Sequence, residues 1–254
     1  RINDGSFLFL LHMMSKMKDE STGSRIGIIF NGSPLFNGGA GSGESEIRKW
    51  IIEKDYLETI IALPDQLFYN TGINTYLWIV TNRKSANRKG KVQLINATPF
   101  YKEMQRSLGN KRKLLSPEQI EQITKIYGDF NQNYNCKIFD NSEFGYQRIT
   151  VERPKKAENG SIVRDKKGNY LADADLRDYE NVPIKMNVDD YFEKEVKPHV
   201  SDAWVEHSKT KIGYEINFTK YFYEFKPLRS LAEIKNDILA LEKETDGLIQ
   251  EAIK

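Results

Sequence analysis

The sequence predicts an α/β fold, in which helices pack against a sheet. Three observations support this prediction. Short apolar segments alternate with helical patterns over 1–130, as in a doubly wound domain. From 131 to 229 the chain is more polar and has many turn residues, so we expect a mixed, largely irregular region with an exposed loop or hairpin at about 153–183. Residues 230–254 then form an amphipathic helical pattern.

The first half of the predicted α/β region contains two helices and two strands. Apolar residues recur at helical spacing over 7–17, and "RIGIIF" at 25–30 has the composition of a strand buried in a parallel sheet. A second helical pattern covers 44–54. The apolar run at 57–63 predicts the next strand, which Pro64 stops.

The second half adds a pair of strands and a helix. The apolar segments at 73–82 and 91–97 predict two strands, which we expect to pair antiparallel across the basic turn between them. The segment 116–130 predicts a helix with a clear start. Ser116 stands at the N-cap position and Gln119 follows three residues later, which is the pattern of a capping box.

The final helix carries its own start signal and an apolar stripe. Ser230 and Glu233 form a second capping-box pattern. The apolar positions that follow have coiled-coil spacing over fewer than three heptads. A stripe of this kind favours a partner helix. The positions expected to make the subunit contact are Ile234, Ile238, Leu241 and Leu248.

Bulk composition excludes several classes of protein. The 254 residues carry a formal net charge of +2, so no overall basicity indicates nucleic acid. The single cysteine, Cys136, excludes an internal disulfide framework and a cysteine-rich zinc site. No apolar run approaches the roughly 20 residues of a membrane span, and no secretory signal is visible. A reducing, cytoplasmic setting without metal or membrane is expected.

The stretch "FNGSPLFNGGAGSGESEIRKW" at 30–50 raises the question of phosphate binding. A dinucleotide fingerprint that began at Gly39 would need glycine where Glu44 stands, and a P-loop would need a lysine that is missing. Glu44 and Glu46 in the first helical turn would repel an anion. A flexible loop is the simpler interpretation. A mobile loop over a binding cleft is the functional one, because ligands bind at the carboxyl ends of parallel strands.

Two further segments suggest contacts with a ligand. Phe68 and Tyr69 precede a glycine turn at the predicted mouth of the sheet, where aromatic rings could stack on a base; packing beneath a loop is the alternative. Two basic clusters, at 83–89 and 105–113, are either solvated loops or contacts to phosphate. The predicted phosphate contacts are Arg83, Lys84, Arg88 and Lys89.

Taken together, these segments resemble the modification (M) subunit of type I restriction–modification systems. The resemblance rests on "LFNGG", "FYNTGI", "KVQLINAT", "FGYQRITVERP", "LRDYENVP" and "VKPHVSDAW", which follow the family's order. It implies the C-terminal part of a class I, Rossmann-like methyltransferase sheet. It also implies transfer of a methyl group from S-adenosylmethionine to the exocyclic N6 of adenine in DNA, with a specificity (S) subunit and a restriction (R) subunit as partners.

The resemblance also implies roles for individual residues. Phe7 lies in the helix that can line the cofactor pocket in the family. Phe68, with Tyr69 as second choice, matches the aromatic that lies against the flipped base. The remaining residues expected at the rim of the cleft are Asn31, Gly32 and Asn70.

The family's catalytic motif does not occur in the sequence. That motif contains a Pro-Pro dipeptide, and none exists here. The glycine-rich cofactor loop and the acidic residue that binds the ribose are also expected upstream. We therefore expect a fragment that neither methylates DNA nor binds the cofactor well by itself. Two other functions stay open: a docking module for the S subunit, and an independent nucleotide-binding enzyme that uses the glycine loop.

Overall fold

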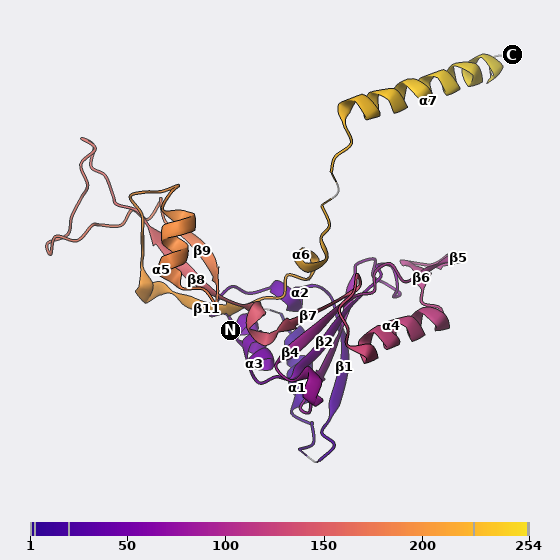
Figure 1. Ribbon diagram of the computed structural model, residues 1–254, viewed down its shortest axis with the longest axis horizontal. Coiled ribbons are helices and arrows are strands. Elements are labelled where there is room, and N and C mark those ends of the chain that lie inside the picture. Colours follow the sequence, from indigo (N-terminus) through magenta and orange to yellow (C-terminus); the bar gives the residue numbers. More distant parts are fainter. Residues whose placement is uncertain (1, 3, 20, 226, 253–254) are drawn as a thin grey trace. The chain divides into compact units, whose positions relative to one another are not determined.

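A computed structural model describes residues 2, 4–19, 21–225 and 227–252, with side chains except those of residues 242 and 246–252. The chain divides into two compact units, Arg1–Tyr221 and Phe222–Lys254. The first unit holds two main sheets, and the second holds one long helix (Figure 1).

The N-terminal part of the first unit alternates helices and strands, as the sequence predicts. In chain order its elements are α1 (Ser6–Met14), β1 (Arg25–Phe30), α2 (Ser33–Phe36), α3 (Gly43–Glu53), β2 (Leu57–Leu63), β3 (Thr75–Thr81), η1 (Ala86–Arg88), β4 (Lys91–Asn96), β5 (Lys102–Leu108), β6 (Lys111–Leu114), α4 (Pro117–Asp129) and β7 (Cys136–Asp140). The capping box of α4 is confirmed: the Ser116 hydroxyl accepts from the Gln119 amide, and the Gln119 side chain accepts from the Ser116 amide.

The five-stranded sheet has the order β1-β3-β2-β4-β7. Strand β3 lies antiparallel between β1 and β2, and β2 pairs parallel with β4. The expected antiparallel pairing of 73–82 with 91–97 is therefore wrong, because β2 separates β3 from β4. The turn between β3 and β4 passes over one strand, and no local sequence signal distinguishes such a turn from a hairpin loop.

Strand β1 also differs from the prediction. It is not buried between parallel neighbours but pairs antiparallel with β3 and forms the edge of the sheet among the described strands. Its apolar residues divide between the two faces: Ile26 and Phe30 are buried, whereas Ile29 is 44% exposed. An apolar run alone does not reveal how many neighbours a strand has.

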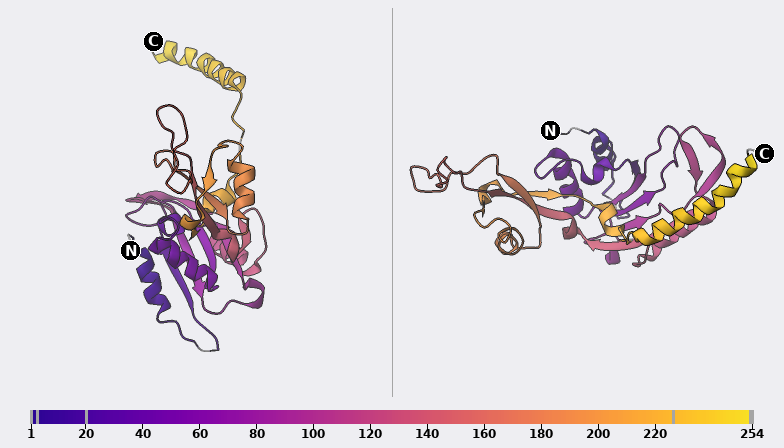
Figure 2. Two further views of the ribbon diagram at one scale, coloured as in Figure 1. Left: turned by 90° about the vertical axis from the view of Figure 1, so that its left-hand side faces the viewer. Right: turned by 90° about the horizontal axis from the view of Figure 1, so that it is seen from above.

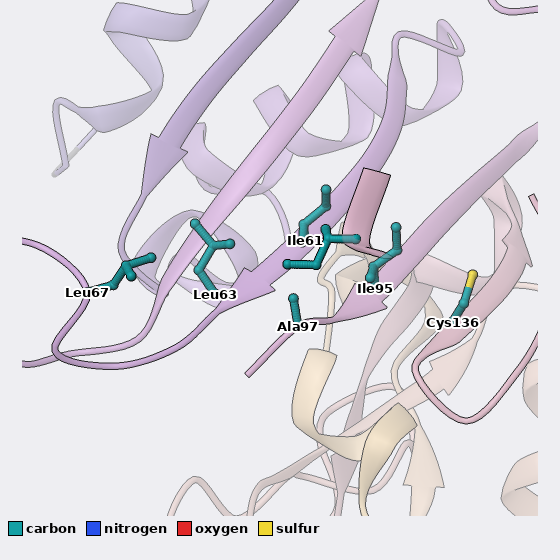
Figure 3. Close-up of a cluster of buried hydrophobic side chains, with 7 residues drawn as sticks. Ile61, Leu63, Leu67, Ile95, Ala97 and Cys136 are labelled. Atoms are coloured by element: carbon teal, nitrogen blue, oxygen red, sulfur yellow. The ribbon is translucent and has the colours of Figure 1, made fainter. Parts of the chain in front are cut away.

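The two faces of the sheet carry separate apolar clusters. On one face the Phe7 ring of α1 packs edge-on against Phe30 and Trp78, with centroids 6.2 and 5.9 Å away. On the other face Ile123 of α4 packs over residues of β2, β4 and β7. Figure 3 shows members of this second cluster, which comprises Ile61, Leu63, Leu67, Ile95, Ala97, Ile123 and Cys136. Because neighbouring strand residues point to opposite faces, α1 and α4 cover opposite sides of the sheet.

Residues 141–222 are more regular than predicted. They form η2 (Asn141–Phe144), β8 (Gly145–Glu152), β9 (Asp178–Pro183), α5 (Val188–Tyr191), η3 (Phe192–Val196), β10 (Trp204–Val205), η4 (His207–Lys209), β11 (Lys211–Tyr214) and α6 (Phe218–Phe222). β8 pairs with β9, β10 and β11 in a four-stranded sheet. Exposed loops of residues 153–177 extend from this sheet, and β9 occupies the last part of the predicted loop (Figure 2).

Arg48 of α3 connects the glycine-rich loop to the second sheet. Its side chain is fully buried, and it donates to the carbonyl oxygens of Tyr214, Pro34 and Gly38 at 2.7, 3.1 and 3.2 Å. The Ser45 hydroxyl accepts from the Tyr214 amide at 3.0 Å. A buried arginine inside a helix is rare in soluble proteins, and no feature of the sequence predicted this one.

The second unit contains α7 (Leu231–Ala252). Its predicted capping box is confirmed, because the Ser230 hydroxyl accepts from the Glu233 amide and the Glu233 carboxylate accepts from the Ser230 amide. Ile234, Ile238 and Leu241 are 40%, 62% and 64% exposed. The side chain of Leu248 lies outside the described residues. Across the described residues, no helix is both long and apolar enough to span a bilayer.

Candidate functional site

The carboxyl ends of three strands lie at the same end of the five-stranded sheet, which we call its carboxyl edge. β1 and β2 run in the same direction because both are antiparallel to β3, and β4 is parallel to β2. Asn31 follows β1 at this edge, and the segment 64–74 leaves β2 there before it enters β3. Ligands of open α/β sheets bind at this edge, and both segments that contain the predicted cleft residues lie there.

An apolar pocket of about 610 Å³ lies beside this edge. The predicted aromatics Phe68 and Tyr69 both line it, together with Ile29, Leu77 and Tyr127. Phe68 is half-buried and packs against the second apolar cluster, whereas Tyr69 is 60% exposed. Phe68 therefore forms part of the wall, and Tyr69 presents the more accessible ring.

The basic hairpin β5–β6 holds the aromatic loop in place. The Gln66 carbonyl accepts from the amides of Arg112 and Lys113 at 3.0 and 3.1 Å. The Lys111 ammonium donates to the Leu67 carbonyl at 2.7 Å and lies 5.3 Å from the centroid of the Tyr69 ring. The sequence shows these residues only as a basic cluster, because the docking of the hairpin on the loop joins residues about 45 positions apart.

The other predicted rim residues are Asn31, Gly32 and Asn70, and the structure shows their local surroundings. The Asn31 amide oxygen accepts from the Ser33 amide at 2.9 Å, a local hydrogen bond between residues two positions apart just before the short helix α2. A β-carbon at Gly32 would lie 3.6 Å from the rings of Phe36 and Tyr76, which is ordinary van der Waals contact, so the position does not require glycine. Asn70 adopts a left-handed backbone conformation with φ of 48°, which asparagine accepts more readily than most residues.

The structure contradicts the role predicted for Phe7. Its ring is 1% exposed and is enclosed by Phe30 and Trp78, so it cannot line a pocket for a cofactor. The same helix presents Phe9 and Met13 outward instead, and both line a hollow of about 570 Å³ beside β1. The apolar pattern of α1 covers more than one face, so the sequence did not show which phenylalanine faces the core.

Two of the four predicted phosphate contacts are also corrected. Lys84 and Arg88 are each 6% exposed and are paired internally. Lys84 donates to Asp55 at 2.6 Å, and Arg88 lies 3.6 Å from Glu58. The buried position lowers the pKa of Lys84, although Asp55 opposes this effect. A phosphate could not reach these two cations without displacing their carboxylate partners. We therefore assign them a structural role in internal ion pairs.

Arg83 and Lys89 are exposed, but they lie at the opposite edge of the sheet from Asn31 and Phe68. Strand β3 begins beside the end of β1, where Tyr76 pairs with Phe30, and finishes beside its start, where Thr81 pairs with Arg25. Seven strand residues separate the two edges by about 20 Å. The antiparallel direction of β3 therefore carries the basic turn away from the candidate site.

The glycine-rich loop does not form a phosphate cradle. Ser42 caps α3, with its hydroxyl accepting from the Ser45 amide at 3.3 Å, and Glu44 is buried in the first turn. The carbonyls of the loop point instead to the Arg48 guanidinium. This arrangement favours neither ATP nor a dinucleotide, in agreement with the acidic helix start.

The described residues do not fit a cofactor site for S-adenosylmethionine. Beside β1 the hollow has mainly apolar walls, and its one carboxylate, Asp4, accepts from the Ser6 amide and hydroxyl at 2.8 and 2.7 Å. The described residues also do not place three or more His, Cys, Asp or Glu side chains together in a group that could hold a metal ion.

Comparison with known proteins decides the family. The family model of N-6 DNA methylases matches residues 2–161, which is more than half of the chain. The chain belongs to this family. The resemblance to type I modification subunits is confirmed by relatives that carry that description.

Two curated relatives show how much of a methylase subunit the chain spans. The type I restriction enzyme MjaIX methylase subunit of Methanocaldococcus jannaschii is 32% identical over 157 residues, which cover 61% of this chain and 26% of the relative. The HindI methylase subunit of Haemophilus influenzae is 37% identical over 185 residues, which cover 71% and 37%. The chain thus matches only 26% and 37% of these two relatives.

A solved structure gives a further comparison. The methyltransferase subunit of a type I restriction–modification system from Streptococcus thermophilus aligns with 56% of this chain and 28% of its own. The identity is 25% and the TM-score is 0.48.

Proposed function

We propose that this chain is part of a DNA adenine methyltransferase of the type I modification-subunit kind. Its complete form would methylate adenine N6 with S-adenosylmethionine as methyl donor, together with an S subunit that reads the DNA sequence and an R subunit. The N-6 DNA methylase match over residues 2–161 supports the reaction class. The names of the relatives support the type I assignment.

One structural observation carries the proposed role of the chain's own residues. Phe68 and Tyr69 line an apolar pocket at the carboxyl edge of the sheet, and Lys111 holds the Tyr69 loop. An adenine taken out of the duplex needs an apolar surface and a ring to stack on. We propose that Tyr69 stacks on the extruded base and that Phe68 forms the wall behind it.

The chain alone would not transfer a methyl group. This part of the proposal is supported by the lack of a Pro-Pro dipeptide in the sequence and by the hollow beside β1, whose residues do not fit the cofactor. The contribution of the described residues would be to bind and orient the base, which lowers the barrier by positioning rather than by chemistry.

The experiment uses a complete modification subunit that contains this sequence, assembled with its S subunit, and labelled S-adenosylmethionine. Tyr69→Ala and Phe68→Ala should each reduce kcat/KM for methyl transfer by about 10- to 100-fold, because stacking on one base contributes about 1–3 kcal/mol. Tyr69→Phe should keep most of the activity. A duplex with 2-aminopurine at the target position would report loss of stacking through its fluorescence.

The matched control is Tyr223→Ala, because Tyr223 is another exposed tyrosine, at 69%, and lies outside the pocket. It should leave kcat/KM unchanged. Wild-type rates in both Tyr69→Ala and Phe68→Ala would reject the base-binding role. If the wild-type assembly transferred no methyl group at all, the proposed reaction itself would be wrong.

A second candidate function is docking to the S subunit through α7. The observation that favours it is the exposed apolar stripe of Ile234, Ile238 and Leu241. An α-helical segment of the S subunit is the proposed occupant, because coiled-coil spacing matches another helix. This role is compatible with the first, since the two use different units of the chain.

A further inference from the structure

A polar pocket of about 430 Å³ lies over one face of the second sheet. Three basic side chains line it, Arg148, Lys209 and Lys211. Thr150, Tyr179 and Ser208 add hydroxyl groups. None of these residues lines the pocket of Phe68 and Tyr69, so this is a separate concave site whose chemistry favours an anion.

The pairing of β8 with β11 places two like charges directly opposite each other. Arg148 and Lys211 are register partners in this antiparallel pair. Like charges at opposed positions destabilise a sheet. Among the described residues, no carboxylate lies within 4.0 Å of either cation. No ion pair among the described residues therefore balances the charge at this point of the sheet.

A carboxylate on the same strand as Arg148 already has two partners. Glu152 of β8 is 1% exposed and accepts from Arg177 at 2.9 Å and from Lys209 at 2.7 Å. These two cations neutralise Glu152 and leave Arg148 and Lys211 as the positive charge of the pocket. An anion from outside the described residues would remove the cross-strand repulsion.

The glycine-rich loop forms one wall of the site. A β-carbon at Gly39 would lie 3.2 Å from the Arg148 guanidinium, and one at Gly41 would lie 3.3 Å from the Lys211 side chain. Ala40 between them lines the pocket. The lack of side chains at these two positions lets the loop backbone approach both cations, and the positive φ of 81° at Gly41 also favours glycine there.

The Arg148 guanidinium is also held in position. It lies 4.4 Å from the centroid of the Tyr179 ring of β9, which orients its plane. An arginine oriented in this way can donate two parallel N–H bonds to a phosphate, and a neighbouring lysine adds a point charge.

We propose that Arg148 and Lys211 bind a backbone phosphate of duplex DNA. The choice of DNA as the source of the phosphate rests on the proposed function; the anion site itself rests on the opposed charges, the pocket and the loop. The glycine stretch thus has a phosphate-binding role after all, but as a wall beside two cations of the second sheet rather than as a cradle of backbone amides.

The test measures binding of this chain to a short fluorescent DNA duplex by anisotropy over a series of salt concentrations. Lys211→Gln should weaken binding severalfold at about 0.1 M salt, because it removes one of the two cations that hold the phosphate. Arg148→Gln/Lys211→Gln should lower the magnitude of the slope of log K against log salt by about one, because one phosphate contact contributes about 0.9 to it. Lys211 is exposed and has no ion pair among the described residues, so the single variant should fold normally.

The control is Lys166→Gln/Lys167→Gln, which removes two exposed charges from the 153–177 loops. It should leave the slope unchanged, because neither lysine contacts the proposed phosphate. Equal binding by the wild type and the Arg148→Gln/Lys211→Gln variant would overturn the inference. So would equal losses in both double variants, or no binding by the wild type at about 0.05 M salt, where nonspecific DNA contacts are strong.

The methyl-transfer assay separates this inference from the proposed function. Methyl transfer by the complete assembly, with DNA binding that does not depend on Arg148 and Lys211, would reject only the phosphate site. DNA binding that depends on both residues, without methyl transfer by the assembly, would reject only the proposed reaction.

Discussion

The Arg48 guanidinium donates to the Tyr214 carbonyl at 2.7 Å, across 166 positions of the chain. The donor lies in α3, beside the first sheet, and the acceptor ends β11 of the second. Its two other acceptors, the carbonyls of Pro34 and Gly38, belong to the segment that leads from β1 to α3. Burial lowers the pKa of Arg48 to about 10, and the charges of Tyr146, Glu215 and Glu44 oppose this effect.

Arg48→Met should lower the free energy of unfolding by about 3 kcal/mol or more, because three buried carbonyls would lose their donor. Chemical denaturation monitored by circular dichroism measures this. Arg106→Met is the control, since Arg106 is exposed in β5, and its effect should stay within about 0.5 kcal/mol. Equal effects of the two substitutions would show that the buried arginine does not hold the sheets together.

Asp55 should make stability depend on pH. Burial raises the pKa of Asp55, but hydrogen bonds from Lys84, Gly90 and Asn141 outweigh burial and set the pKa below its ordinary value. Since the folded pKa is depressed, the contribution of Asp55 is complete above the unfolded value of about 4 and is lost as pH falls through the folded value.

Asp55→Asn should therefore cost about 3 kcal/mol at pH 7, where buried Lys84 loses its counter-charge, and the gap to wild type should narrow below about pH 4. Urea denaturation at pH 7, 5 and 3 tests this. Asp175→Asn, at an exposed position, should show no such convergence. A gap that stayed constant down to pH 3 would contradict the assignment.

Gly38 should be intolerant of any side chain. Its φ of 82° is left-handed, and a β-carbon there would lie 2.3 Å from the hydroxyl of Ser42, which caps α3. Gly38→Ala should cost about 2–3 kcal/mol, from backbone strain and loss of the cap together. The thermal midpoint reports this loss. Gly72→Ala, where no atom lies within 4 Å, should change stability by less than about 1 kcal/mol.

The apolar stripe of α7 should be needed for docking. Leu241→Glu should abolish co-purification with the S subunit while the fold of the first unit survives, because a charge would be buried in a helix–helix interface. Asn236→Glu adds the same charge at an exposed position off the stripe and should leave docking intact. Docking that survived Leu241→Glu would exclude the stripe as the contact.

The local signals of the sequence predicted the helices that have caps. Ser116 with Gln119 and Ser230 with Glu233 both form their capping boxes, because a cap involves residues only three positions apart. The aromatic loop was also located, since Phe68 follows a strand that an apolar run and Pro64 delimit. Its pocket was not predictable, because Lys111 and Tyr127 arrive from distant elements.

Most helices and strands up to residue 130, and the C-terminal helix α7, were predictable from the sequence alone, since these depend on apolar period, caps and turn residues within a few positions. The hairpin β5–β6, strand β7 and the second sheet were not. Contacts in the folded chain were needed to show that β3 lies between β1 and β2, that Lys84 and Arg88 are buried beside Asp55 and Glu58, and that Arg148 meets Lys211. Strand order and the partner of a charge depend on contacts between residues far apart in the chain, for which local pattern carries no signal.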